Sequence, residues 1–209
     1  MQLIFSRKKL LSLLGFATNI AAWRGRSEGS LVRAAQRRDR EAFRDLMNLH
    51  ADSLKRFVSR RVNESDREDV LQDTWLAAWE NLESFDCSDR FRTWLFSICF
   101  HKIQDHWRRE HRRPPSAVYA PHDDGPSYMP REFSRVELRE AMREFWESCT
   151  PEQREMLTMY YSDGLTLKEM SQVLRLNLNT VKYQFYRAHE TANRALGSSI
   201  DALLASEAR

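Results

Sequence analysis

The stretch from Glu68 to Phe85, EDVLQDTWLAAWENLESF, constrains the fold more than any other part of the chain. It contains no helix breaker, and the pattern Ser65-x-x-Glu68 just ahead of it predicts a capping box at a helix start. Apolar residues at helical spacing predict one broad buried face: Leu71, Trp75, Ala78, Trp79, Leu82 and Phe85. A second face is acidic and holds a single leucine: Asp69, Gln72, Asp73, Leu76, Glu80 and Glu83. The stretch therefore predicts a helix packed on one side, whose acidic side faces either solvent or a partner.

Charge is distributed unevenly along the chain, although the net charge of +3 by itself indicates no partner. Residues 31–63 hold 9 basic and 4 acidic groups, residues 64–90 hold 2 and 9, and residues 91–113 hold 6 and 2. Because an acidic block repels phosphate, we expect residues 64–90 to face protein, whereas the basic block after them is suited to nucleic acid.

The cysteines are odd in number and scattered, which is typical of a reducing cytoplasm and not of a disulfide framework. They are Cys87, Cys99 and Cys149. Cys99 and His106 share a helical face, with His101 and His111 nearby, so a zinc site is conceivable, but paired short ligand spacing is missing. No phosphate loop, nucleophile elbow or metalloprotease motif is present. We therefore expect no metal, no cofactor, no catalytic residue and no small-molecule substrate.

The first 30 residues are open to three interpretations. The apolar run Leu10–Trp23 lies between basic residues, as in a signal peptide, but its 14 residues are too few to span a bilayer. The segment is a disordered leader or the result of a misplaced start codon, an interfacial amphipathic helix, or a regulatory segment.

Helical patterns lie on both sides of the stretch Glu68–Phe85. Apolar residues three and four apart predict helices from Leu31 to Val62, with a polar break at residues 37–40. After a polar loop at residues 86–89, the segment Arg90–Arg113 predicts one long helix in which aromatic and basic residues alternate. Most of those aromatics belong in a core. The basic residues form a solvated face or, beside aromatic rings, a surface for single-stranded DNA.

The remaining chain predicts a linker and then more helices. Five of the six prolines lie in residues 113–133, which is typical of a linker, and Ser134–Ser148 resumes a helical pattern. Thr150-Pro151-Glu152-Gln153 predicts a helix start with a threonine cap and a glutamine at the third position.

Two shorter helices follow. Thr166-x-x-Glu169 predicts a capping box and a helix through about Leu174, then a turn at residues 175–177. Asn179 or Thr180 is the expected cap of a last helix, whose inward residues are Val181, Phe185, Ala188 and Ala192. A short helix, a tight turn and a second helix indicate either a helix-turn-helix or a plain helical hairpin.

Several of these stretches resemble the bacterial extracytoplasmic-function (ECF) sigma factors of RNA polymerase. EDVLQDTWLAAW is similar to the signature helix of the family, and FRTWLFSI followed by DHWRR to its sigma-2 domain. TPEQREML, GLTLKEMS and TVK…YRA are similar to its sigma-4 domain. The resemblance implies an all-α, two-domain protein: sigma-2 at residues 31–113, a linker at 114–133 and sigma-4 at 134–196, with a tail from 197 to 209.

The resemblance also implies a function and its residues. The signature helix would bind core RNA polymerase through Asp69, Gln72, Asp73 and Leu76. The −10 element would be bound by Asp86, Ser88, Arg90, Arg92, Trp94, Lys102, Arg108 and Arg109. The −35 element would be bound by Thr180, Lys182, Tyr183, Tyr186 and Arg187. The implied partners are core polymerase, promoter DNA and an anti-sigma factor, and the implied location is the cytoplasm. The alternative is a helix-turn-helix regulator that does not engage core polymerase.

Three points depart from the family or lie outside it. Arg175 stands where the family usually has a turn glycine, and Tyr183-Gln184 replaces the usual Ser-Arg, which leaves the −35 preference open. We expect Arg187 and Tyr183 to contact bases and Lys182 to contact phosphate, unless the tyrosines are half-buried. The first 28 residues precede the resemblance, and we expect transcription in vitro not to need them.

Overall fold

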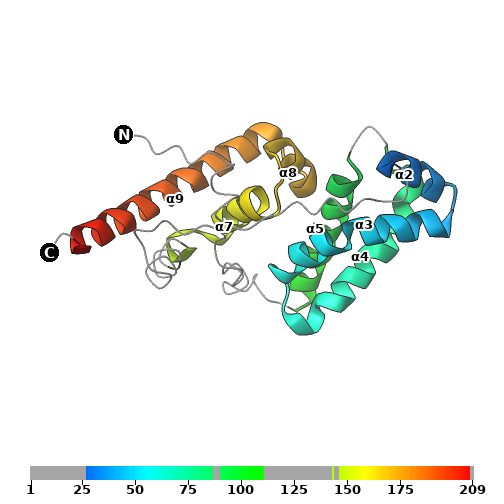
Figure 1. Cartoon of the computed structure of the whole chain (residues 1–209), viewed down its shortest axis with the longest axis horizontal. Coiled ribbons are helices and arrows are strands. Elements are labelled where there is room, and N and C mark those ends of the chain that lie inside the picture. The colour runs from blue at the N-terminus through cyan, green and yellow to red at the C-terminus, as the bar shows by residue number, and fades with distance from the viewer. Residues whose placement is uncertain (1–26, 87–89, 111–142, 144–145, 208–209) are drawn as a thin grey trace. The chain divides into compact units, whose positions relative to one another are not determined.

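The computed structural model describes residues 27–86, 90–110, 143 and 146–207, and within α9 it describes side chains only as far as residue 191 and at 194. These residues are helical or form turns, with no strand among them, so the expected all-α class is confirmed. They fall into two compact units (Figure 1). One unit holds helices α2 to α5 with residues 168–176, and the other holds α7, η3 and α9.

The first helices that the structure describes are α2, Glu28–Gln36, and α3, Arg40–Ser59, separated at the expected polar break. Ser27 caps α2, so this helix begins three residues before the expected start of the sigma-2 domain. The His50 ring of α3 lies 3.0 Å from the Glu28 carboxylate. This hydrogen bond lowers the pKa of Glu28, against the opposing effect of burial. The contact therefore stabilises the fold above the unfolded pKa of Glu28 and is lost as pH falls through the folded value.

The stretch Glu68–Phe85 and the residues just before it form η1, Glu64–Asp66, then α4, Arg67–Asn81, and η2, Leu82–Ser84. The expected capping box is wrong, because Ser65 lies inside the 3₁₀ turn and its hydroxyl donates to the Asp66 carboxylate over 2.8 Å. Arg67 is the residue that joins this start to α3, since its guanidinium donates to the carbonyls of Ser59 and Val62. The α-helix also ends earlier than expected, and Phe85 is extended.

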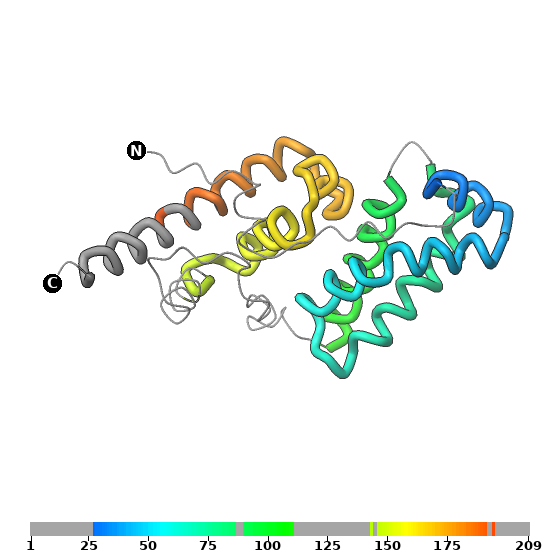
Figure 2. The backbone as a smooth tube through the Cα atoms, in the orientation of Figure 1, coloured from blue at the N-terminus to red at the C-terminus, as the bar shows by residue number. Residues whose placement is uncertain are grey.

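Helix α5, Phe91–Arg109, completes the bundle: α3, α4 and α5 pack against one another, and α2 packs on α3 (Figure 2). The core lies between them, with Leu46, Phe57 and Leu95 fully buried. Phe57 stacks on Phe96 at 4.6 Å between ring centroids. As expected, most aromatic residues of α5 are buried. The linker and most of residues 134–148 lie outside the described residues.

The second unit begins with α7, Pro151–Leu157, which continues into a π-helical turn, η3, Thr158–Ser162. Its predicted capping box is confirmed: Thr150 Oγ1 accepts from the Gln153 N–H, and the Gln153 side chain accepts from the Thr150 N–H. Gln153 also donates to Thr191 of α9, which α7 packs against. Gly164, with φ of 69°, ends the segment in a conformation that glycine adopts without strain.

The short helix α8, Leu167–Leu174, has the predicted bounds, and α9 runs from Leu178 to Glu207. The expected cap of α9 at Asn179 or Thr180 is wrong. Asn177 takes that role, because its side chain accepts from the Asn179 N–H at 2.8 Å and its carbonyl accepts from Val181. Helix α9 also continues through most of the expected tail.

Arg175, in the turn between α8 and α9, has a φ of 52°. A Cβ atom is strained in this region, where glycine is at ease. We expect Arg175→Gly to raise the stability of α8 and the start of α9 by up to about 1 kcal/mol. Arg175→Ala keeps the Cβ and should give no such gain. Slower amide exchange of residues 167–181 in the glycine variant alone is the expected result; equal exchange in both variants would contradict it.

Candidate functional site

The acidic face of α4 is exposed. Asp69, Gln72 and Glu80 are exposed, Asp73 is half-buried, and Leu76 is 57% exposed in their midst. The opposite side of the helix is buried, although not quite as predicted. Val70 and Thr74 are buried there, and the Thr74 hydroxyl is satisfied because it donates to the Val70 carbonyl.

The two tryptophans of α4 lie at the margin of its buried side. Trp75 and Trp79 are only half-buried, and both pack on Phe43 of α3, at 6.1 and 4.9 Å between ring centroids. They therefore fix the rotation of α4 on α3. An apolar side chain surrounded by carboxylates, held on a helix of fixed rotation, is suited to a protein surface with a complementary basic and apolar patch.

The basic residues expected at the −10 element differ in how free they are. Arg90 is exposed but lies 3.4 Å from the Glu169 carboxylate of α8. Arg108 pairs with Asp105 at 3.0 Å, and Lys102 is half-buried. The Arg92 guanidinium lies 4.4 Å from the Phe96 ring centroid. Asp86 is exposed, and Ser88 lies outside the described residues. Trp94 packs against Phe85 at 4.9 Å and Phe91 at 5.6 Å, which makes it partly a core residue.

An ion pair connects the acidic face of α4 with the basic end of α5. Arg109, at the end of α5, lies 3.9 Å from the Asp73 carboxylate on the acidic face. The Arg109 side chain is largely exposed and the Asp73 side chain is about half exposed, so the pair contributes little to stability. It places the last turn of the basic helix beside the acidic face.

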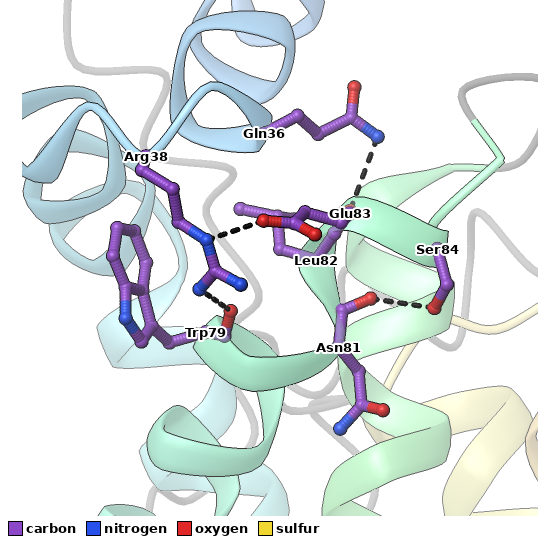
Figure 3. A network of polar contacts seen from close by, with 7 residues as sticks. All are labelled: Gln36, Arg38, Trp79, Asn81, Leu82, Glu83 and Ser84. Atoms are coloured by element: carbon purple, nitrogen blue, oxygen red, sulfur yellow. Dashed lines mark hydrogen bonds and ion pairs between the residues drawn. The ribbon is translucent and has the colours of Figure 1, made fainter.

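A polar network holds the chain just before the 86–89 loop, and sequence analysis missed it. The Gln36 amide donates to the carbonyl of Leu82 at 3.2 Å (Figure 3). It also donates to the carbonyl of Phe85, at 2.8 Å. Arg38 donates to the Glu83 carboxylate and to the Trp79 carbonyl (Figure 3).

The same network accounts for the backbone of Arg38. This residue adopts a φ of 67°, and its side-chain contacts offset the strain of that conformation. The partners in the network lie more than 40 residues apart in sequence, so no local pattern could have shown it.

The start of α9 presents the residues expected at the −35 element. All five are exposed on the surface of the helix: Thr180, Lys182, Tyr183, Tyr186 and Arg187. Tyr183 and Tyr186 are each 62% exposed, so the half-buried alternative for them is wrong. Val181, Phe185 and Ala188 are buried as expected, whereas the side chain of Ala192 lies outside the described part.

Positive charge on this surface comes from Lys182 and Arg187. Burial lowers the pKa of the nearby His189 and raises the pKa of Tyr161, so both are neutral near pH 7. The Arg187 guanidinium carbon lies 5.7 Å from the centroid of the Tyr183 ring, one helical turn away.

The zinc site that the sequence left conceivable would involve Cys99 and His106 of α5. Cys99 is fully buried, and His106 of α5 lies 3.4 Å from the Asp66 carboxylate. Within the described residues, no cluster of three or more potential ligands could hold a metal ion. None of the described helices is both long and apolar enough to cross a bilayer.

Two family models match the chain and together cover slightly more than half of it. Residues 46–113 match sigma-70 region 2, and residues 147–190 match sigma-70 region 4. The ECF RNA polymerase sigma-E factor of Escherichia coli K12 is 29% identical over 171 residues, which span 77% of this chain and 89% of that protein. The sigma-E factor of Haemophilus influenzae is 23% identical, with coverage of 78% and 92%.

Two solved structures share the fold. CnrH, solved in complex with the cytosolic domain of CnrY, is 28% identical and has a TM-score of 0.56, covering 84% of this chain and 97% of its own. RpoE of Bartonella quintana, solved with the anti-sigma factor NepR, has a TM-score of 0.53 at 19% identity, covering 75% and 98%.

Proposed function

This chain belongs to the ECF family of sigma factors, which bind core RNA polymerase, recognise the −10 and −35 promoter elements and direct transcription initiation, and we propose which of its surfaces does each task. The acidic face of α4 binds core polymerase, the basic surface of α5 contacts the −10 region, and the start of α9 reads the −35 element.

One observation carries the assignment of the polymerase surface. Leu76 is 57% exposed on a helix whose other aliphatic residues are mostly buried, and Asp69, Gln72 and Asp73 surround it. An exposed leucine keeps apolar surface in contact with water, and burying that surface against a partner is favourable. The surrounding carboxylates repel phosphate, so the partner is protein and not DNA.

The exposed basic side chains of α5 and of the chain just before it contact the −10 element. Arg90 and Arg108 offer charge to a DNA backbone, and Trp94 offers a partly exposed ring on which a base can stack. The Gln36 network is important here because it fixes Phe85, next to Asp86. Arg92 and Lys102, which are half-buried, contribute mainly through the shape and potential of the surface.

At the −35 element, we assign Lys182 to phosphate, and Arg187 and Tyr183 to bases, with Thr180 and Tyr186 beside them. The five residues occupy the exposed side of the first turns of α9. This is the part of a recognition helix that meets base edges in the major groove.

We further propose an anti-sigma factor as a partner and the cytoplasm as the location. CnrH, at 28% identity, was solved bound to the cytosolic domain of another protein, CnrY. A partner that covers the acidic face would compete with core polymerase. As a transcription initiation factor, the chain leaves nucleotide chemistry to the polymerase, and we assign it no catalytic residue.

The alternative, a helix-turn-helix regulator that does not engage polymerase, explains less of the chain. It accounts for residues 147–190 but not for the match of residues 46–113 to sigma-70 region 2.

Run-off transcription with purified core polymerase, followed by mapping of the start sites, tests the proposal. We expect transcripts that begin a fixed distance from a shared −10 and −35 pair, and none without this protein. The free chain should bind duplex DNA weakly. Tight sequence-specific binding without core, together with no run-off product, would instead favour the plain regulator.

Truncation tests the role of the N-terminus. Because Ser27 caps α2, the truncation must end before residue 27 instead of at residue 28. Removal of residues 1–25 should leave run-off transcription unchanged. Removal of residues 1–28 should destabilise the first unit by about 1 kcal/mol or more, because it deletes the Ser27 cap and the Glu28–His50 contact. Loss of transcription in the shorter truncation would show that the leader has a function.

A further inference from the structure

Tyr183 and Arg187 of α9 are one helical turn apart and touch. The Arg187 guanidinium carbon lies over the Tyr183 ring, 5.7 Å from its centroid. Both side chains are exposed, so neither is held there by burial in the core. The contact therefore favours one direction for an arginine that would otherwise sample many rotamers in water.

The contact leaves the hydrogen-bonding groups of the arginine available. A cation–π contact uses none of the N–H donors of a guanidinium, which lie in its plane. Two such donors match the O6 and N7 acceptors of a guanine in the major groove. A phosphate contact needs no such alignment, and Lys182, a compact point charge on a flexible stem, is suited to that role.

We propose that Tyr183 and Arg187 form a single reading unit that selects a guanine in the −35 element. Arg187 donates two hydrogen bonds to the guanine. Tyr183, assigned above to the bases, acts on this guanine as a positioning residue, through its contact with the Arg187 guanidinium. This inference rests on the proposed −35 role of α9 and adds the base that is read. Tyr183 stands where the family usually has serine, so this role would be specific to this chain.

The supporting structure of α9 agrees with such a role. Val181, Phe185 and Ala188 are buried beneath this surface, and Phe185 stacks on Tyr160 at 4.6 Å between ring centroids. Asn177 caps the helix. The backbone that carries Tyr183 and Arg187 is therefore rigid, so the direction of the pair is defined relative to the whole unit.

The test uses holoenzyme reconstituted from the full chain and core polymerase, with a promoter library randomised across the −35 element. Wild-type holoenzyme should select one guanine. Arg187→Ala should lose this selection, and Tyr183→Leu should weaken it about two- to fivefold, the expected size of a cation–π contact. Tyr183→Phe keeps the ring and should restore it. Lys182→Ala should weaken all sequences alike and lower the salt slope by about one unit.

The outcomes are distinct. Unchanged guanine selection in Tyr183→Leu, or no rescue by Tyr183→Phe, would overturn the positioning role of the tyrosine. Selection of another base by the wild type would overturn the choice of guanine. Initiation from a premelted −10 template, which does not need the −35 element, reports separately whether the chain works as a sigma factor. Loss there in the wild type would refute the proposed function itself.

Discussion

A variant that combines Asp73→Arg with Gln72→Ala is expected to lose binding to core RNA polymerase while it stays folded. Both residues lie on the accessible side of α4, beside the 57% exposed Leu76. Placing like charges opposite each other at an interface costs several kcal/mol. Because each 1.4 kcal/mol is a factor of ten, affinity should fall by roughly 100-fold or more.

The fold should tolerate this change. The ion pair that is lost within the described part of the chain, between Asp73 and Arg109, is a surface pair worth about 0–1 kcal/mol. Asp52→Arg, an equal charge reversal at an exposed position of α3, is the matched control and should retain binding. A pull-down with core polymerase measures binding, and circular dichroism measures folding, for the wild type, the double variant and Asp52→Arg. Undiminished binding by the double variant would remove the acidic face from the polymerase interface.

Two leucines of the same stretch should behave in opposite ways when each is changed to alanine. Leu82 is 1% exposed, and its loss leaves a cavity in the core of the first unit. We expect Leu82→Ala to reduce the stability of that unit by about 2–5 kcal/mol. Leu76 is exposed, so Leu76→Ala should change stability by less than about 0.5 kcal/mol, yet weaken core binding.

The measurement must separate the two units, since a two-unit chain need not unfold in one step. Amide exchange in α3, α4 and α5, followed by mass spectrometry, reports on the first unit alone. Faster exchange in Leu82→Ala only, together with weaker core binding by folded Leu76→Ala, is the expected pattern. If Leu76→Ala bound core normally, the exposed leucine would have no role at the interface.

Much of the fold could be predicted because it depends on local spacing. Helical periodicity separated the acidic face of α4 from the side that carries Ala78 and Leu82, because side chains three and four apart share a face whatever packs on them. The Thr150–Gln153 capping box was predictable for the same reason, since both of its hydrogen bonds join residues three apart.

The errors arose where two local solutions competed. Ser65 had the spacing of a cap, but a 3₁₀ turn enclosed it and its hydroxyl bonded to Asp66 instead. Asn177, Asn179 and Thr180 are all good cap residues, and the choice of Asn177 followed from where the chain leaves the turn at Arg175.

Local patterns along the chain are enough to tell which helices form, which of their faces are apolar and which segments carry charge of each sign. Tertiary packing is what brings Gln36 and Arg38 to the chain around Leu82 and Glu83. It also decided that Arg109 lies beside Asp73. Periodicity describes how one helix is amphipathic, but the register between two helices depends on how their side chains interlock, and no spacing along the chain records that.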